Sequence, residues 1–140
     1  MSYRTAIMLD EGHLGARAGL AVVLDRAGRW DEAQQAYEAA VALCNGADLA
    51  MEVTLACNFA GFMHTSHRNL KRAAEMYEAA LRADPGHIAS KVNYGQLLVD
   101  GDTEAEVKKG ETLLISVLET LTLAKEKESF RREAQQGQEW

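Results

Sequence analysis

The sequence predicts an all-α fold, made of repeated helix-turn-helix units and followed by a long C-terminal helix. Strong helix formers dominate the chain, which contains a single proline, and no stretch alternates apolar and polar residues between Asn-Gly or Asp-Gly turns. Similar helix-length phrases also recur along the sequence. With 140 residues and a mass of 15.4 kDa, the chain has about the length of one domain and can bury a core without disulfides or metals.

Three phrases carry the repeat: YRTAIMLDEGH from Tyr3, YEAAVALCNGA from Tyr37 and YEAALRADPGH from Tyr77. Each has an alanine three residues after the tyrosine and then a turn that contains glycine. The second and third phrases also have an alanine four residues before the tyrosine, Ala33 and Ala73. A small residue one turn away on the same face allows close helix packing, so we expect each phrase to be the second helix of a unit.

The first helices of the units begin after the glycine turns, and each contains a bulky residue followed by a small one. The spacings of 34 and 40 residues between the tyrosines imply an excess of six residues in the middle unit. We expect most of this excess to start its first helix about one turn early, near Asp48. The predicted organisation is a single domain over 1–140, with a trailing half-repeat at 2–13, repeats at 14–47 and 48–87, a divergent repeat at 88–121 and a helical extension at 122–140.

The last helix is expected to begin at a capping box formed by Thr103 and Glu106, and little opposes helix between there and Gly137. An apolar seam at three- and four-residue intervals would pack it on the preceding helix; its members are Val107, Gly110, Leu114, Val117, Leu121 and Ala124. Ile115 and Leu118 lie off this seam, so we expect them to be bare. The charged stretch after Ala124 is typical of a solvated helix.

These features resemble the tetratricopeptide repeat, a helix-turn-helix unit with a 34-residue period. The resemblance covers residues 2–121 and includes the small-aromatic-small spacing in the second helix and the sequence DPGH at a junction. It implies an α-α superhelix whose first helices line a concave groove that receives partner peptides. Aromatic and small residues at the repeat positions then form the core: Leu20, Leu24, Ala33, Tyr37, Ala40, Phe59, Ala73, Tyr77, Ala80, Tyr94 and Leu98.

The same resemblance places a mixed, weakly charged set of residues on the concave face: Val22, Asp25, Asn58, His64, Val92, Asn93 and Gln96. Asn58 and Asn93 are the best candidates for amides that hold a peptide backbone, although ordinary solvated side chains would give the same pattern. Some members of the family hold the C-terminal carboxylate of chaperone peptides with lysines, an arginine and asparagines. At those positions this chain keeps only Asn58, which argues against chaperone tails as partners.

Composition and charge argue against several classes of partner and location. The net charge is −6 and the pI is about 5.2, which argues against a nucleic-acid partner because such binding rests on basic side chains. No apolar run approaches the length of a membrane span, and no secretory signal is evident at the N-terminus. Cys44 and Cys57 lack metal-ligand spacing and are predicted to be reduced core residues, so we expect a soluble protein of a reducing, cytoplasmic compartment.

Catalysis has little support in the sequence, which contains no nucleophile elbow, phosphate-binding glycine loop or catalytic triad pattern. We predict no catalytic residues, no metal and no cofactor. His64 and His67 lie three residues apart near Cys57, which leaves a metal- or ligand-assisted hydrolase as an alternative. An RNA-binding helical repeat is another, although only Arg17 and Lys91 come near the concave face.

The sequence therefore favours a non-enzymatic interaction module or scaffold that binds protein partners through its groove and its exposed repeat ends. A half-repeat at the front, with Tyr3, Ala6 and Ile7, and the bare residues Ile115 and Leu118 at the back would leave apolar surface uncovered. We expect these ends to contact another copy, a partner subunit or further repeats, as part of a larger assembly.

Overall fold

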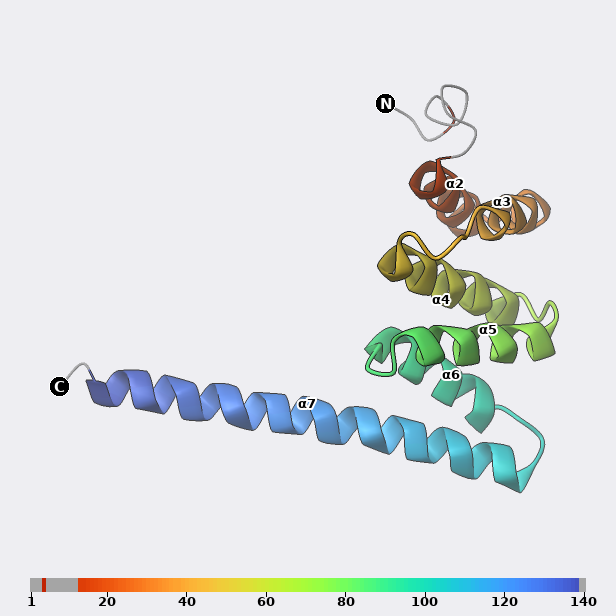
Figure 1. Cartoon of the computed structure of the whole chain (residues 1–140). Coiled ribbons are helices and arrows are strands. Elements are labelled where there is room, and N and C mark those ends of the chain that lie inside the picture. Colours follow the sequence, from red (N-terminus) through yellow and green to blue (C-terminus); the bar gives the residue numbers. More distant parts are fainter. Residues whose placement is uncertain (1–3, 5–12, 139–140) are drawn as a thin grey trace. The chain divides into compact units, whose positions relative to one another are not determined.

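A computed structural model describes Arg4 and residues 13–138 of the chain, and within them every regular element is a helix (Figure 1). The all-α prediction is therefore confirmed for this part of the chain. The helices of the described residues are α2 (Leu14–Arg26), α3 (Trp30–Ala42), α4 (Leu49–Thr65), α5 (Leu70–Ala83), α6 (Ile88–Val99) and α7 (Glu104–Gln138). The expected half-repeat with Tyr3, Ala6 and Ile7 lies outside the described residues.

The chain divides into two compact units, with the boundary inside α6. The first unit ends at Asn93 and the second begins at Tyr94. The repeat pattern predicts a single domain over 1–140 with repeat boundaries between helices, and this organisation stays a prediction.

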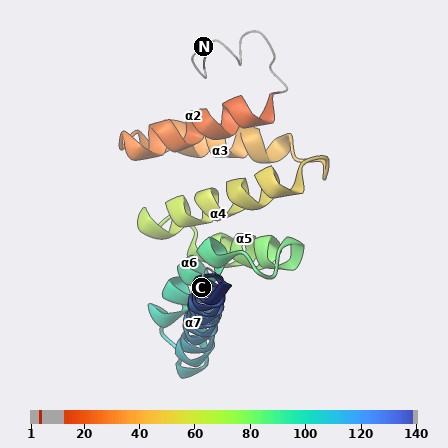
Figure 2. The same cartoon turned by 90° about the vertical axis from the view of Figure 1, so that its left-hand side faces the viewer.

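The first unit is built from two helical hairpins. Helix α2 packs against α3, and α4 packs against α5, while α4 also contacts both helices of the first hairpin. Figure 2 shows the two hairpins next to each other, with α4 in the middle of the unit. This central position explains why α4 buries more side chains than its neighbours.

Side-chain caps begin three helices of this unit, α2, α4 and α5. The Asp48 carboxylate accepts a hydrogen bond from the backbone N–H of Met51 at 3.1 Å, so α4 begins at Leu49, a turn early as predicted. His13 Nδ1 accepts from the backbone N–H of Ala16 at 2.9 Å and starts α2. The Asn69 side chain caps α5 from a left-handed backbone conformation, which asparagine tolerates.

Aromatic rings fill the centre of the first unit. The Tyr37 ring stacks on the Phe59 ring with centroids 4.9 Å apart and meets the Phe62 ring at 5.4 Å. Of the residues expected in the core, Leu20 alone is only half-buried, whereas Leu24, Ala33, Tyr37, Ala40, Phe59, Ala73, Tyr77, Ala80, Tyr94 and Leu98 are buried. Cys57 is buried as expected, but Cys44 is only half-buried; both are free cysteines.

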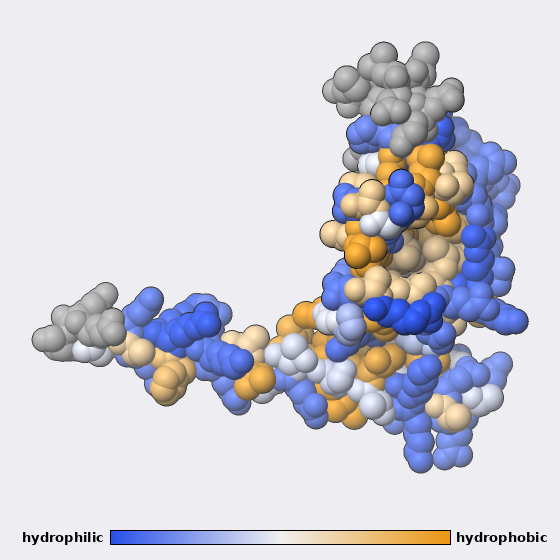
Figure 3. All heavy atoms as spheres, viewed as in Figure 1, coloured by the Kyte–Doolittle hydropathy of each residue, from blue (hydrophilic) through white to orange (hydrophobic). Residues whose placement is uncertain are grey.

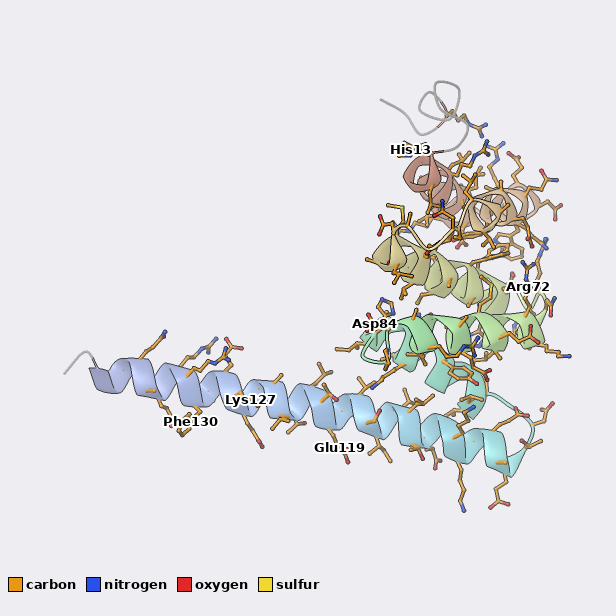
Figure 4. All side chains as sticks on the ribbon, in the orientation of Figure 1. His13, Arg72, Asp84, Glu119, Lys127 and Phe130 are labelled. Atoms are coloured by element: carbon orange, nitrogen blue, oxygen red, sulfur yellow. The ribbon has the colours of Figure 1, made fainter. Side chains whose placement is uncertain are left out.

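Arginines of α5 and of the turn before it connect the second hairpin to α3. Arg72 of α5 holds the Glu38 carboxylate of α3 with both guanidinium nitrogens, one of them at 2.9 Å, and the same guanidinium lies 4.9 Å from the centre of the Phe59 ring. Arg68 donates to Gln34 and to Asp31, each at 2.8 Å. Figure 4 shows Arg72 near the start of α5, on the side of the unit that is hydrophilic in Figure 3.

The second unit consists of the end of α6, a short loop and α7. Thr103 Oγ1 accepts a hydrogen bond from the backbone N–H of Glu106 at 3.2 Å, so the predicted start of α7 is confirmed. Gly110 is buried where the two helices come closest: a Cβ added there would lie 2.6 Å from the Gly95 carbonyl oxygen. Glycine is therefore required at this crossing.

The expected seam on α7 ends earlier than its periodicity indicates. Gly110 and Val117 are buried, but Leu121 and Ala124 are exposed, because no described element of this unit covers α7 beyond that point. Ile115 and Leu118 are exposed as predicted, by 54% and 64%. Of the helices described, none combines the length and the apolar content that crossing a membrane requires.

Candidate functional site

The first unit contains a hollow of about 290 Å³, which we call the polar hollow. It is lined mainly by residues of α2, α4 and the start of α6, together with the core tyrosines Tyr37 and Tyr77. Its lining consists of Val22, Asp25, Arg26, Tyr37, Cys57, Asn58, Gly61, Phe62, His64, Thr65, Tyr77 and Asn93. Apolar and polar groups of both hydrogen-bonding types therefore face one space.

Tyr37 and Asp25 form the best-defined polar pair of this hollow. The Tyr37 hydroxyl donates to Asp25 Oδ2 at 3.0 Å, which joins α3 to α2. Burial, followed by the charge of Asp25 and this hydrogen bond, raises the pKa of Tyr37 far above its ordinary value. The hydroxyl thus remains protonated at any physiological pH and holds one oxygen of the carboxylate in place.

The amides of Asn58 and Asn93 come from α4 and α6 and reach the same hollow. Both residues are exposed. Asn93 Nδ2 lies 3.7 Å from the buried sulfur of Cys57, and sulfur is a weak acceptor. A ligand carbonyl would be a stronger acceptor for this amide, so the contact with Cys57 orients Asn93 without competing strongly for it.

Five residues of the predicted groove line the polar hollow together: Val22, Asp25, Asn58, His64 and Asn93. The other two do not. Val92 is exposed on the neighbouring position of α6, and Gln96 belongs to the second unit, where its amide donates to Asp100 Oδ1 at 2.9 Å. The predicted groove residues that the hollow brings together are thus those of α2, α4 and the first turns of α6, and the groove itself stays a prediction.

Sequence reasoning missed the tyrosine hydroxyls, Arg26 and Thr65 as parts of this site. It assigned Tyr37 and Tyr77 wholly to the core, and their rings are indeed buried. A buried tyrosine nevertheless needs a polar environment at its tip. Tyrosine rather than phenylalanine at both repeat positions was therefore a signal in the sequence for a polar site beside the core.

A second hollow, of about 230 Å³, is almost wholly apolar and lies between the end of α3, the start of α4 and the end of α5. Figure 3 shows hydrophobic spheres gathered on the left of the first unit, where α4 begins and α5 ends. Cys44 and Glu52 are at its edge, and burial, with the nearby Glu52 carboxylate, raises the pKa of the Cys44 thiol. The raised pKa makes this thiol a poor nucleophile.

The two histidines considered for metal binding have different surroundings. His64 lines the polar hollow, whereas His67 lies in the turn before α5 with a positive φ of 54°. Within Arg4 and residues 13–138, no group of three or more His, Cys, Asp or Glu side chains is placed to hold a metal ion. Of the basic residues expected near the concave face, neither Arg17 nor Lys91 lines the hollow.

Comparison of the sequence with protein-family models and with curated proteins finds no match to either. The function is therefore inferred from the geometry of the polar hollow and from the pattern of the repeats.

Proposed function

We propose that this chain is a non-enzymatic protein-interaction module of the tetratricopeptide-repeat type, which binds an extended segment of a partner protein in the polar hollow. The observation that carries the proposal is the convergence of Asp25, Asn58 and Asn93, from three different helices, on one space with apolar side chains beside them. The paired hairpins α2/α3 and α4/α5 support the assignment to repeats, because their bounds follow the predicted units.

The chemistry of the hollow suits a peptide backbone. Each asparagine offers an amide donor and a carbonyl acceptor, which together can replace the hydrogen bonds that one residue of an extended peptide makes to water. Val22 and Phe62 supply apolar contact beside these amides. A volume of about 290 Å³ is at the lower end of ligand pockets, so we expect it to take a few residues of a longer segment.

The same groups are poorly suited to catalysis. The Tyr37 hydroxyl is already bound to Asp25, and its raised pKa disfavours the phenolate. The proposal therefore assigns no reaction to the hollow.

A random peptide library displayed on phage and selected on the immobilised full chain tests the proposal. We expect the selected peptides to bind the wild-type protein, and Asn58→Ala and Asn93→Ala to weaken binding by about two- to tenfold each, since one net hydrogen bond contributes about 0.5–1.5 kcal/mol. Isothermal titration calorimetry with a selected peptide measures both effects.

Gln35→Ala is the matched control, because it removes an exposed amide from α3 of the same unit without touching the hollow. It should leave peptide affinity unchanged. If the asparagine variants, folded by circular dichroism, bind the peptide as tightly as the wild type, the polar hollow is not the binding site.

A further inference from the structure

We propose that the chain forms a homodimer in which α7 pairs with α7 of a second copy in antiparallel orientation, centred on Leu118. The surface involved is one face of α7, which we call the α7 face. It adjoins the seam that packs on α6 and shares Leu121 with it, a residue that is exposed, and it lies wholly in the second unit. The proposal is independent of the polar hollow.

The centre of the α7 face is apolar and open to solvent. Leu118 is 64% exposed, and Ile115 and Leu121, one turn before and one turn after it, are 54% and 49% exposed. Residues three and four positions apart are neighbours on a helix surface, so these three side chains form one continuous patch. Apolar patches of this kind on soluble proteins mark contacts.

Charged residues continue the α7 face on both sides of this patch, and their signs are opposite at equal distances from Leu118. Glu111 lies seven residues before it and Lys125 seven residues after it. Glu104 and Arg132 stand fourteen residues away on the two sides, and these charged side chains are exposed. At 3.6 residues per turn, steps of three, seven and fourteen stay on one side of the helix.

A two-fold axis through Leu118 therefore brings unlike groups together. In an antiparallel pair Leu118 meets its own copy, Ile115 meets Leu121 of the second copy, and Glu111 meets Lys125. Glu104 of one copy would meet Arg132 of the other at each end of the paired face. The two ends lie about 42 Å apart along the helix at 1.5 Å per residue. Because the arrangement is symmetric, each unlike pair occurs twice.

Charged residues at the edges of the α7 face also favour the antiparallel pairing. Lys108 and Glu128 lie ten residues before and after Leu118. Within the chain Glu128 already accepts from Arg132 at 2.7 Å, so the ends of the face would form a network of Arg132, Glu128 and the acidic and basic residues of the second copy. A parallel pair would instead place Glu111 beside Glu111 and Lys125 beside Lys125, which like-charge repulsion disfavours.

Analytical ultracentrifugation of the full chain over a range of concentrations tests the proposal. We expect a monomer-dimer equilibrium for the wild type and at least a tenfold weaker dimer for Leu118→Glu, which puts two carboxylates on the axis. Leu123→Glu is the matched control: it makes the same substitution at an exposed leucine about 140° around the helix and should leave the dimer unchanged.

A charge-exchange cycle tests the orientation. Glu111→Lys and Lys125→Glu should each weaken the dimer, by facing a like charge in the second copy, and the double variant should restore it. A chain that is monomeric at every concentration overturns the proposal. Equal loss of the dimer in Leu118→Glu and Leu123→Glu, or no rescue in the double variant, overturns the antiparallel arrangement.

Discussion

The two units of this chain are both helical, but they are stabilised in different ways. In the first unit, three aromatic rings from α3 and α4 lie within 6.3 Å of one another, and buried alanines let the helices of each hairpin approach closely. In the second unit, α6 and α7 meet at a glycine crossing, and every side chain described after Val117 is exposed. The first unit is thus a packed core and the second a single helical contact with a long open helix.

This difference separates the two functional proposals. A packed unit can hold the amides of Asn58 and Asn93 at defined positions, which recognition of an extended segment requires. An open helix in water gains most of its stability from packing against something else. The first unit is therefore suited to recognition and α7 to association.

The largest difference in the free energy of unfolding is expected between substitutions of two phenylalanines, one in each unit. Phe59→Ala removes a buried ring that stacks on Tyr37, and it should lower the free energy of unfolding by about 3–5 kcal/mol. Phe130→Ala, at a side chain 74% exposed on α7, should change it by less than about 0.5 kcal/mol. Urea denaturation followed by circular dichroism measures both. Similar losses would show that α7 has a partner as extensive as the core.

A smaller change in the free energy of unfolding is expected at the hydrogen-bonded pair of Tyr37 and Asp25, which joins the core to the polar hollow. Asp25→Ala leaves the buried Tyr37 hydroxyl without its acceptor and should cost about 1–3 kcal/mol. Asp25→Asn keeps an acceptor and should cost less. Adding Tyr37→Phe to Asp25→Ala should recover part of the loss, and a double-mutant cycle in urea measures the coupling. Additive losses would contradict the role given to this hydrogen bond.

Within the second unit, two glycines of α7 are predicted to respond in opposite ways. Gly110→Ala would put a Cβ 2.6 Å from the Gly95 carbonyl oxygen and 2.9 Å from the Val99 backbone nitrogen, so it should loosen α7 from α6 at a cost of about 1–3 kcal/mol. Gly137→Ala meets nothing within 4 Å and should stabilise the helix slightly. Hydrogen exchange along α7 distinguishes the two, and unchanged protection in Gly110→Ala would contradict the close crossing.

The smallest effect concerns the ion pair on the outer side of the first unit. The hydrogen bond from Arg72 lowers the pKa of Glu38 below its ordinary value of 4.5. A depressed carboxyl pKa contributes stability above the unfolded-state value, and this contribution is lost as the pH falls through the folded-state value. With side chains 34% and 41% exposed, the pair should contribute less than about 1 kcal/mol.

Glu38→Gln should therefore lower stability slightly at pH 7 and flatten its decrease below about pH 4.5, as measured by thermal melts across the acid range. Glu32→Gln is the comparison, because its arginine partner lies three residues away on the same segment and does not join two hairpins. A steeper acid decrease in Glu38→Gln than in the wild type would contradict the assignment.

The sequence predicted the helices and most of the first unit's core, because alanine-tyrosine-alanine spacing and polar caps are local signals. It also predicted the early start of α4 from the length of one repeat. It did not predict that Leu20 is only half-buried, or that the buried part of the seam on α7 ends at Val117. In both cases periodicity identifies a face of a helix but not whether a neighbour covers it.

The candidate site was predictable to a similar extent. Asn58 and Asn93 were found because equivalent positions of successive repeats face the same side, whereas Gln96, further along α6, falls in the second unit. The pairing of Arg72 with Glu38 was missed because each of these charged side chains, taken singly, is typical of a solvated helix face. Their separation of 34 residues equals the shorter spacing of the repeat tyrosines, and this signal could have revealed the pair.

The most direct test of recognition by the polar hollow is an NMR titration of the isotope-labelled full chain with a selected peptide. The proposal predicts that the largest amide shifts occur at residues 22–26, 58–65 and 93, while the α7 face keeps its positions. Shifts confined to α7 or to the apolar hollow, at saturating peptide, would contradict it.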